Sequence, residues 1–282
     1  MNVTTPDLIY ATYDYHIEDF HSIASGCFSV NCSGTVIVGG GWDASNTALN
    51  NVFEFTSNGV NSIQPLNTAR SYSSAIFYSS ASQNDNNVLL VTGGLQTNSI
   101  EFLIMNRSFR INLWQQCSDK LPLKVSGHQL TILNKRIILT GGYIHDESRC
   151  INKVWEGKIS FETGFRIIWS SLPSMLMCRS DHVAVVLENK LYCIGGYGEN
   201  KGLESSEYYS FEENKWQRGP DLQATLSNAK GVVDYASQCI IMGGLCDGKN
   251  SSKVSLFDPQ KGLLQIQGEH DIGRAGHVAV LL

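Results

Sequence analysis

The sequence predicts an all-β protein in which one small antiparallel sheet is repeated several times along the chain. Glycine doublets recur at intervals of 53, 48, 54 and 48 residues, and each follows a short apolar run rich in β-branched residues. Short runs of this kind that end abruptly at glycine are typical of buried strands. Hardly any segment has the apolar periodicity of a helix. The doublets are Gly40-Gly41, Gly93-Gly94, Gly141-Gly142, Gly195-Gly196 and Gly243-Gly244.

Each doublet lies inside a longer repeated unit. A second strand-like segment precedes it and starts with a basic residue or a histidine, as in residues 70–77 and 179–186, although the copy at residues 228–233 lacks the histidine. An aromatic residue follows the doublet and a large apolar residue stands seven positions later, as in Tyr209 and Trp216. Each unit therefore supplies about four short strands joined by polar, glycine-rich turns.

Several such sheets can bury their apolar faces only against one another. Radial stacking around an axis covers both faces of each sheet and leaves only short strand edges exposed, which is the β-propeller arrangement. Glycine suits the ends of the inner strands, because it has no Cβ and so allows a positive φ and a close approach of the neighbouring backbone. We expect the tryptophans to fill the space between adjacent sheets.

The repeated features together resemble the kelch repeat. They are the period near 50 residues, the apolar run with its glycine doublet, the Tyr-x6-Trp hairpin and the Arg-x-x-His strand start, and they extend over residues 21–282. The resemblance implies one kelch-type β-propeller domain over residues 1–282, with six blades of four antiparallel strands. Residues 21–271 supply about five full repeats and residues 272–282 the first strand of the last blade, which strands in residues 1–20 close. The alternative to this closure is an incomplete chain.

Composition and charge restrict the classes of protein. The chain has 282 residues, 17% charged residues and a formal net charge of −5, with no block of like charges. Disordered tails and coiled coils carry far more charge, and binding to nucleic acid or to an anionic membrane needs a basic surface. No apolar run approaches the length of a signal peptide or of a membrane span. We therefore expect a cytoplasmic globular protein that binds neither nucleic acid nor membrane.

The cysteines pose a separate question, because the eight of them could by number form disulfides. The chain is long enough to fold without crosslinks, shows no export signal and places several cysteines within strand-like runs. We expect these cysteines to be reduced, packed thiols.

No residue pattern indicates a metal or another cofactor. His128, His182 and His277 occupy the same position in their repeats, which indicates a structural role in each blade. Residues 243–250 nearly match a phosphate-binding loop, but Asn250 replaces the hydroxyl residue, and a strand-like sequence follows where a helix would be needed. We expect no cofactor and no metal.

Two classes of propeller enzyme are the alternatives to a binding role. In the galactose-oxidase-like copper oxidases, whose propellers use kelch-like blades, a segment similar to residues 69–75 carries a ligand tyrosine, which would be Tyr72. The crosslinked cysteine of that family aligns with Ser25, so such an oxidase would have lost its ligands. A sugar mutarotase or epimerase would need an arginine and glutamate constellation that the sequence does not identify. We find no catalytic constellation and expect that the chain is not an enzyme.

The turns after the doublets are the candidate binding surface, because binding residues concentrate on loops of a rigid scaffold. The residue after the doublet is aromatic in three copies, and Tyr and Trp offer a large contact area together with a polar group. In kelch substrate adaptors this position, together with arginines at the strand starts, lines the pocket that grips a partner peptide. The resemblance therefore implies partner-binding roles for Trp42, Arg70, Tyr143, Arg179, Tyr197 and Arg274.

A structural role for the same residues is the alternative: the aromatic side chains would cover blade ends and the arginines would tie neighbouring turns together. We expect a protein–protein interaction module that binds another protein or a peptide on loops at one face of the propeller. The family resemblance alone suggests substrate recognition for a ubiquitin ligase, or binding to actin and the cytoskeleton. No BTB, BACK or F-box sequence is present in these residues, so a ligase adaptor would need a further part of the protein.

Overall fold

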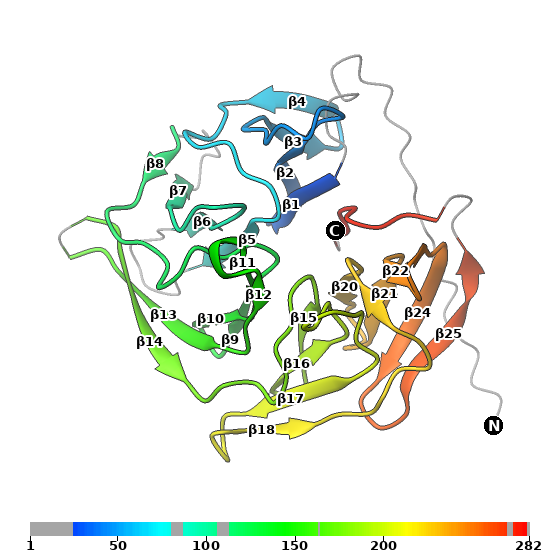
Figure 1. Ribbon diagram of the computed structural model, residues 1–282. Coiled ribbons are helices and arrows are strands. Elements are labelled where there is room, and N and C mark those ends of the chain that lie inside the picture. Colours follow the sequence, from blue (N-terminus) through cyan, green and yellow to red (C-terminus); the bar gives the residue numbers. More distant parts are fainter. Residues whose placement is uncertain (1–24, 80–86, 106–112, 163, 270–272, 281–282) are drawn as a thin grey trace.

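The computed structural model describes residues 25–79, 87–105, 113–162, 164–269 and 273–280. Within these residues, five four-stranded antiparallel sheets are arranged like blades around a central axis (Figure 1). In every blade the strands follow one another in chain order from the axis outward, as short connections favour. The helical turn in this part of the chain is the short 3₁₀ turn η2 (His145–Glu147). The all-β propeller predicted from the sequence is confirmed.

The strands of the blades have the following bounds. Blade 1 contains β1 (Ser25–Cys32), β2 (Thr35–Trp42), β3 (Val52–Thr56) and β4 (Gly59–Ile63). Blade 2 contains β5 (Ser74–Ser79), β6 (Asn87–Thr92), β7 (Ile100–Met105) and β8 (Gln115–Gln116). Blade 3 contains β9 (Gln129–Leu133), β10 (Arg136–Thr140), β13 (Val154–Ser160) and β14 (Arg166–Leu172). Blade 4 contains β15 (Val183–Leu187), β16 (Lys190–Ile194), β17 (Ser206–Ser210) and β18 (Lys215–Arg218).

Blade 5 contains β20 (Lys230–Val233), β21 (Cys239–Met242), β24 (Lys253–Asp258) and β25 (Gly262–Glu269). Two small sheets are formed by loops of blades 3 and 5. One pairs β11 (Tyr143–Ile144) with β12 (Arg149–Cys150), and the other joins β19 (Leu226–Ser227), β22 (Leu245–Cys246) and β23 (Lys249–Asn250).

The apolar core lies between the blades. Four of the buried clusters each combine side chains from two neighbouring blades. They join blade 1 to blade 2, blade 2 to blade 3, blade 3 to blade 4, and blade 4 to blade 5. Trp114 and Trp216 are buried in such clusters, and their indole N–H groups donate to the carbonyl oxygens of Gln64 at 3.0 Å and Pro173 at 2.8 Å, at the end of the preceding blade. For these two residues, the prediction that tryptophan fills the space between blades is confirmed.

The glycine doublets connect each blade to the next. The second glycine of each doublet donates its N–H to a carbonyl oxygen at the entry of the next blade, over N–O distances of 2.7 to 2.9 Å. These bonds join Gly41 to Arg70, Gly94 to Val125, Gly142 to Arg179, Gly196 to Leu226 and Gly244 to Arg274. At the first glycine any side chain would collide, since a Cβ on Gly141 would lie 2.2 Å from the carbonyl oxygen of Arg179. The predicted close approach of the neighbouring backbone is confirmed.

A closed ring of six backbone hydrogen bonds surrounds the axis. Its members are Gly26, Tyr72, Gly127, Asp181, Asn228 and Gly276. Each N–H donates to the carbonyl oxygen of the preceding member, and Gly26 donates to Gly276, over N–O distances of 2.7 to 3.2 Å. All six residues have φ between +51° and +70°, a region that glycine, asparagine and aspartate adopt most readily. The ring gives the disc six radial positions, the number that six blades require.

Residues 273–280 occupy the sixth radial position, between β1 and β20 (Figure 1). Val278 and Val280 pack against blade 1, on a cluster that includes Cys27. The strand predicted here is absent from residues 273–280, because no neighbouring strand in the described chain forms a ladder with them. The predicted closing strands in residues 1–20 lie outside the described residues.

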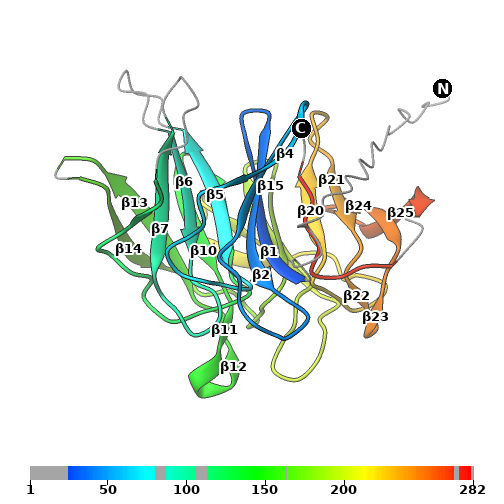
Figure 2. The same ribbon diagram turned by 90° about the horizontal axis from the view of Figure 1, so that it is seen from above.

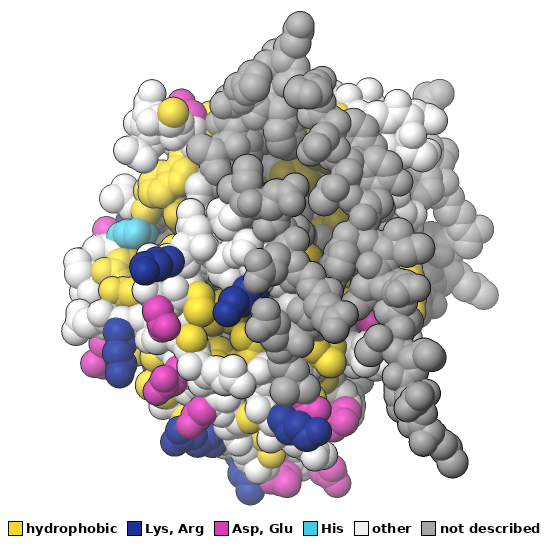
Figure 3. All heavy atoms as spheres, turned by 90° about the vertical axis from the view of Figure 1, so that its right-hand side faces the viewer, with side chains coloured by type: hydrophobic (Ala, Val, Ile, Leu, Met, Phe, Trp, Pro, Cys, Tyr) yellow, Lys and Arg dark blue, Asp and Glu magenta, His cyan; other side chains and the backbone are white. Residues whose placement is uncertain are grey.

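Charged side chains of both signs share the surface of the disc. Figure 3 shows Lys and Arg side chains next to Asp and Glu side chains over the described part of one side of the molecule. In the part of the chain that the structure describes, no helix is long and apolar enough to cross a membrane.

Candidate protein-interaction face

The loops that follow the doublets emerge together at one end of the disc, which we call the loop face. Figure 2 shows β11, β12, β22 and β23, which belong to two of these loops, along the same edge of the molecule. The loop that leads into the first strand of each blade reaches the loop face as well. In three blades, the residue that follows the doublet pairs with the residue that directly precedes the blade's member of the axial ring. These pairs are Trp42 with Ser25, Tyr143 with Ser126, and Tyr197 with Ser180.

The three predicted aromatic residues therefore lie around the mouth of the axis on the loop face. Trp42 packs edge-on against Tyr72 of the axial ring, with ring centroids 5.3 Å apart. Tyr143 packs against His145 at 5.0 Å. Tyr197 is the most open of the three, with 41% of its surface exposed. Their geometry leaves all three partly accessible, and their binding roles stay a prediction.

Arg70 and Arg179 do not reach the surface of the loop face. Both are fully buried, and each donates to the carbonyl oxygen of the first glycine of its own blade's doublet. Arg70 also forms an ion pair with Glu101 at 2.7 Å, and Arg179 forms one with Glu207 at 2.7 Å. The prediction that these two arginines contact a partner is wrong, because a side chain without exposed surface cannot do so. Each instead ties the entry loop of its blade to the third strand, whereas Arg274 is exposed and stays a candidate.

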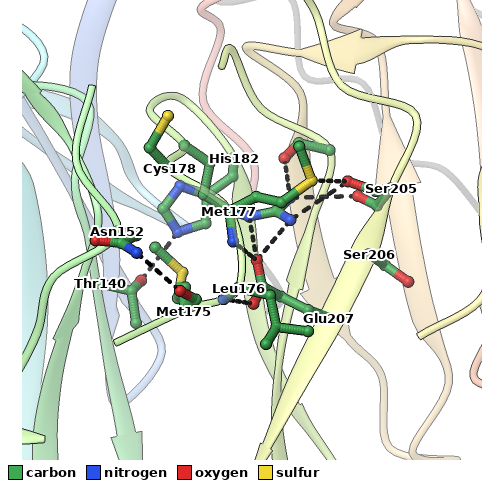
Figure 4. A network of polar contacts seen from close by, with 12 residues as sticks. Thr140, Asn152, Met175, Leu176, Met177, Cys178, His182, Ser205, Ser206 and Glu207 are labelled. Carbon is green, nitrogen blue, oxygen red and sulfur yellow. Dashed lines mark hydrogen bonds and ion pairs between the residues drawn. The ribbon is translucent and has the colours of Figure 1, made fainter. Parts of the chain in front are cut away.

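The entry loop of blade 4 is held firmly beneath its exposed side chains (Figure 4). Besides its buried ion pair, Glu207 accepts hydrogen bonds from the backbone N–H groups of Leu176 at 2.6 Å and Met177 at 3.3 Å. The buried Met175 donates its N–H to the carbonyl oxygen of Asn152 at 2.9 Å and accepts a bond from the Asn152 side chain at 3.0 Å. Buried polar groups with this many partners fix the local backbone.

A groove of about 850 Å³ lies on the loop face between blades 3 and 4, and we call it the blade 3–4 groove. It is lined by residues 148–152, 176–178, 198–201 and 203. A smaller hollow of about 160 Å³, which Arg218 helps to line, also adjoins Leu176 and Met177. These two side chains are 57% and 43% exposed and form an apolar ridge that borders both hollows.

A disulfide between Cys150 and Cys178 joins two segments that line the groove, with 5.5 Å between the Cα atoms. The prediction of reduced thiols is wrong for this pair, because the fold brings together two cysteines that lie 28 residues apart in the sequence. The other six cysteines are free, and five of them are buried. For those five, the prediction of packed thiols is confirmed.

His128 and His182 link neighbouring blades as neutral side chains. A hydrogen bond of 2.8 Å joins Nε2 of His128 to the hydroxyl of Thr92, and one of 2.9 Å joins Nε2 of His182 to the hydroxyl of Thr140, each on the preceding blade. Burial, with the charge of Arg70 as a smaller cause, lowers the pKa of His128 to about 3. Burial lowers the pKa of His182 as well. The structural role predicted for these two histidines is confirmed, and the described residues contain no group of three His, Cys, Asp or Glu side chains that could hold a metal ion.

The two partial enzyme motifs lie in structural positions. Tyr72 belongs to the axial ring, and its pKa is raised by burial, while a hydrogen bond with Ser25 acts in the opposite direction. A serine therefore lies beside this tyrosine where an oxidase needs a crosslinked cysteine. The segment that resembles a phosphate-binding loop continues into strands β23 and β24 in place of a helix, as predicted.

The ridge and the disulfide were not found from the sequence. The ridge lies in the turn between β14 and β15, and the disulfide joins Cys178 of that turn to Cys150 of β12. One signal could have located the ridge. The second glycine of each doublet donates to a carbonyl oxygen in the entry loop of the next blade. Four positions before that acceptor residue, four of the blades have a buried apolar residue. These residues are Leu66, Leu121, Met175 and Leu222. Since Met175 is the buried anchor of its loop, Leu176 and Met177 follow it on the outside.

Comparisons with known proteins agree with this architecture. A family model described as the Kelch motif matches residues 178–223, which enclose the strands of blade 4. Human Kelch-like protein 15 is 28% identical over 159 residues, covering 51% of this chain and 26% of that protein. Mouse Kelch-like protein 35 is 31% identical over 130 residues, covering 46% of this chain and 21% of that protein. The matched part thus spans about a quarter of the length of these relatives.

A solved structure titled "Structure of YjhT" superposes with a TM-score of 0.66. The alignment covers 89% of this chain and 85% of that one at 14% sequence identity, so the similarity concerns the fold alone. The kelch motif in blade 4, the similarity to kelch-like proteins and the propeller fold agree with one another, and together they support a kelch-type β-propeller.

Proposed function

We propose that this chain is a protein–protein interaction module that binds a partner protein or peptide on the loop face, at the blade 3–4 groove. The similarity to kelch-like proteins supports a binding role. The observation that carries the proposal is the apolar ridge of Leu176 and Met177, which stands exposed where the groove and the smaller hollow meet it.

The ridge has the properties of a binding anchor. Single apolar side chains on a surface need no explanation, but adjacent ones beside a hollow are typical of interaction sites. The backbone beneath the ridge is fixed by Glu207 and by the nearby disulfide, so little conformational entropy is lost when a partner binds. Rigid apolar anchors next to pockets contribute most of the binding energy in many interfaces.

The two exposed arginines that line the hollows are each paired with a neighbouring carboxylate. Arg149 forms an ion pair with Glu147 at 2.5 Å, and Arg218 forms one with Asp221 at 2.7 Å, so the arginines are largely neutralised by their neighbours. Such exposed pairs contribute little free energy. We therefore expect the partner to place an apolar side chain against the ridge and polar groups along the rim.

Within this role we propose two uses that rest on the kelch resemblance. The disc serves as the substrate-recognition part of a ubiquitin-ligase adaptor, or it binds a component of the cytoskeleton, in both cases in the cytoplasm. An adaptor also needs a domain that contacts the ligase, which the propeller itself does not supply.

The test replaces the ridge by its counterpart in blade 2. Asn67 and Thr68 hold the same two positions before a buried arginine, so the substitutions Leu176→Asn and Met177→Thr introduce side chains that this backbone already accommodates elsewhere. The matched control is Ile168→Thr on β14, since Ile168 is 64% exposed and lies outside the groove lining.

Affinity purification with the disc as bait should retain a partner on the wild type and on Ile168→Thr and lose it on the double variant. Calorimetric titration with the purified partner should then show binding weaker by at least about tenfold for the double variant, which corresponds to about 1.4 kcal/mol. The unfolding midpoint should stay unchanged, because exposed substitutions rarely affect stability. Equal affinity of all three proteins would contradict the proposal.

A further inference from the structure

The disulfide joins a projecting hairpin to the ridge segment of the blade 3–4 groove. Cys150 is the last residue of β12 and so ends the hairpin of β11, η2 and β12, which spans residues 143–150. Cys178 directly follows the ridge residue Met177. The bond therefore connects two walls of the groove that belong to different loops.

The two walls differ in how firmly they are otherwise held. The ridge segment keeps its hydrogen bonds to Glu207 and Asn152 whatever the state of the disulfide. In the hairpin, β11 and β12 pair at two positions, and residues 146–149 are exposed. Its polar contacts with the rest of the disc include a hydrogen bond of 2.8 Å between Ser126 and His145, the backbone pair of Ser126 with Tyr143, and an exposed ion pair of Lys124 with Asp146. Figure 2 shows the hairpin projecting from the disc. If the disulfide opens, the hairpin is the wall that gains freedom.

We propose that the Cys150–Cys178 disulfide is a redox-exchangeable crosslink that fixes the hairpin wall of the groove, and that low-molecular-weight thiols such as glutathione open it. Its effect on partner binding rests on the proposed function, whereas the exchange itself and its effect on the hairpin do not. In the crosslinked form the hairpin wall is already fixed when a partner binds. Reduction weakens binding, because the hairpin then loses conformational entropy on association.

The exchange follows from the burial of the two residues. Cys178 is half-buried, while Cys150 is buried, so a thiolate that enters the groove meets Cys178 first. Its attack forms a mixed disulfide with Cys178 and breaks the Cys150–Cys178 bond, whose electron pair leaves on the sulfur of Cys150, which then takes up a proton. A second glutathione thiolate attacks the glutathione sulfur and releases Cys178 as a thiolate. Two glutathione molecules are oxidised to one glutathione disulfide while the protein disulfide is reduced by two electrons.

The five buried free cysteines do not compete in this exchange. Burial raises the pKa of four of their thiols to about 12, namely Cys27, Cys32, Cys193 and Cys239. Burial also raises the pKa of Cys117. Such thiols stay protonated at neutral pH and react slowly. Cys246 is half-buried and lies in β22, away from the groove lining, so it supplies the matched control.

The experiment equilibrates the intact chain at a series of ratios of reduced to oxidised glutathione. Free thiols are labelled with light iodoacetamide, the remaining disulfides are reduced and labelled with heavy iodoacetamide, and each cysteine is quantified by mass spectrometry. Hydrogen–deuterium exchange is measured at both ends of the series. The variant Cys150→Ser/Cys178→Ser represents the open form, and Cys246→Ser is the control.

We expect Cys150 and Cys178 to gain light label together in one transition. Amide exchange in residues 146–150 should rise at least about fivefold on reduction of the wild type and of Cys246→Ser, and should be fast at both ends for the double variant. Two results would overturn the proposal: light label on both cysteines at every glutathione ratio, or amide exchange in the hairpin that is equal in the oxidised and reduced protein. Because the reduced wild type is measured too, the test does not depend on the folding of the double variant.

Partner capture separates this inference from the proposed function. Oxidised disc should bind the partner at least about threefold more tightly than reduced disc. Equal capture by both forms overturns the effect of the crosslink on the groove. Failure to capture a partner in either form refutes the proposed function, while the exchange measurements still decide whether the crosslink controls the hairpin.

Discussion

The entry loops of blades 2 and 4 have the same framework. In each, a buried arginine forms an ion pair of 2.7 Å with a glutamate on the third strand, Arg70 with Glu101 and Arg179 with Glu207. Each glutamate also accepts two backbone hydrogen bonds, from the N–H groups of the residues three and two positions before its arginine. The shorter of the two bonds is 2.6 Å in both blades. The repeat therefore reproduces the backbone of the loop almost unchanged.

The two loops differ in the side chains that this backbone presents. In blade 2 the positions hold Asn67 and Thr68, and the Asn67 side chain turns back to Glu101 at 2.9 Å. In blade 4 they hold Leu176 and Met177, which project as the apolar ridge. The comparison teaches that the repeat determines where a loop lies, while the side chains outside the repeat pattern determine what the loop can bind.

Breaking the shared framework should have the largest effect. Arg179→Ala leaves the carboxylate of Glu207 buried without its cation, which should lower the free energy of unfolding by about 3–5 kcal/mol, and Arg70→Ala should do the same in blade 2. Arg218→Ala is the control, because its exposed pair with Asp221 should contribute less than about 1 kcal/mol. Urea unfolding measures all three. A loss in Arg179→Ala no greater than in the control would show that the buried pair does not hold the loop.

The histidines between blades should make the disc sensitive to acid. The pKa of His128 is about 3 in the folded chain and about 6.5 in an unfolded one, so the unfolded chain binds more protons between these values. Stability is therefore complete above the upper value and falls as the pH decreases, by about 3 kcal/mol for this residue at a pH of about 4.

The variant His128→Gln tests this effect, because it can still form a hydrogen bond with Thr92 but does not titrate. The free energy of unfolding, measured by urea denaturation at a series of pH values, should fall less steeply with acid for the variant than for the wild type. Parallel curves for the two proteins would show that His128 is protonated equally in both states.

A smaller effect should distinguish the groove from the mouth of the axis. Tyr197 directly precedes Gly198 of the groove lining, whereas Trp42 lies on blade 1. Tyr197→Ala should therefore weaken partner binding by about three- to tenfold, and Trp42→Ala by less than about twofold, in calorimetric titrations. Equal losses of affinity in the two variants would indicate that the partner binds at the mouth of the axis and would contradict binding at the blade 3–4 groove.

The framework could be predicted from the sequence and the site could not, for physical reasons. The doublets recur because every blade needs the same close contact with its neighbour, as at Gly141, and a steric need of this kind leaves a repeated signal. The repeated pattern could not show whether Arg179 is buried or exposed. An arginine that contacts a partner and an arginine that ties neighbouring turns together would both recur in the repeats. The ridge at Leu176 and Met177 left no repeated signal of its own, because the same positions in blade 2 hold Asn67 and Thr68, and the disulfide left none because it joins two different loops.

Hydrogen–deuterium exchange of the disc with and without its captured partner tests the central claim most directly. We predict slower exchange on binding in residues 175–178 and 198–203, the ridge and the facing wall, and unchanged exchange in the blade 2 entry loop at residues 66–70. Protection spread equally over both entry loops, or confined to the outer strands β4 and β14, would contradict the claim that two side chains in one loop give this propeller its binding site.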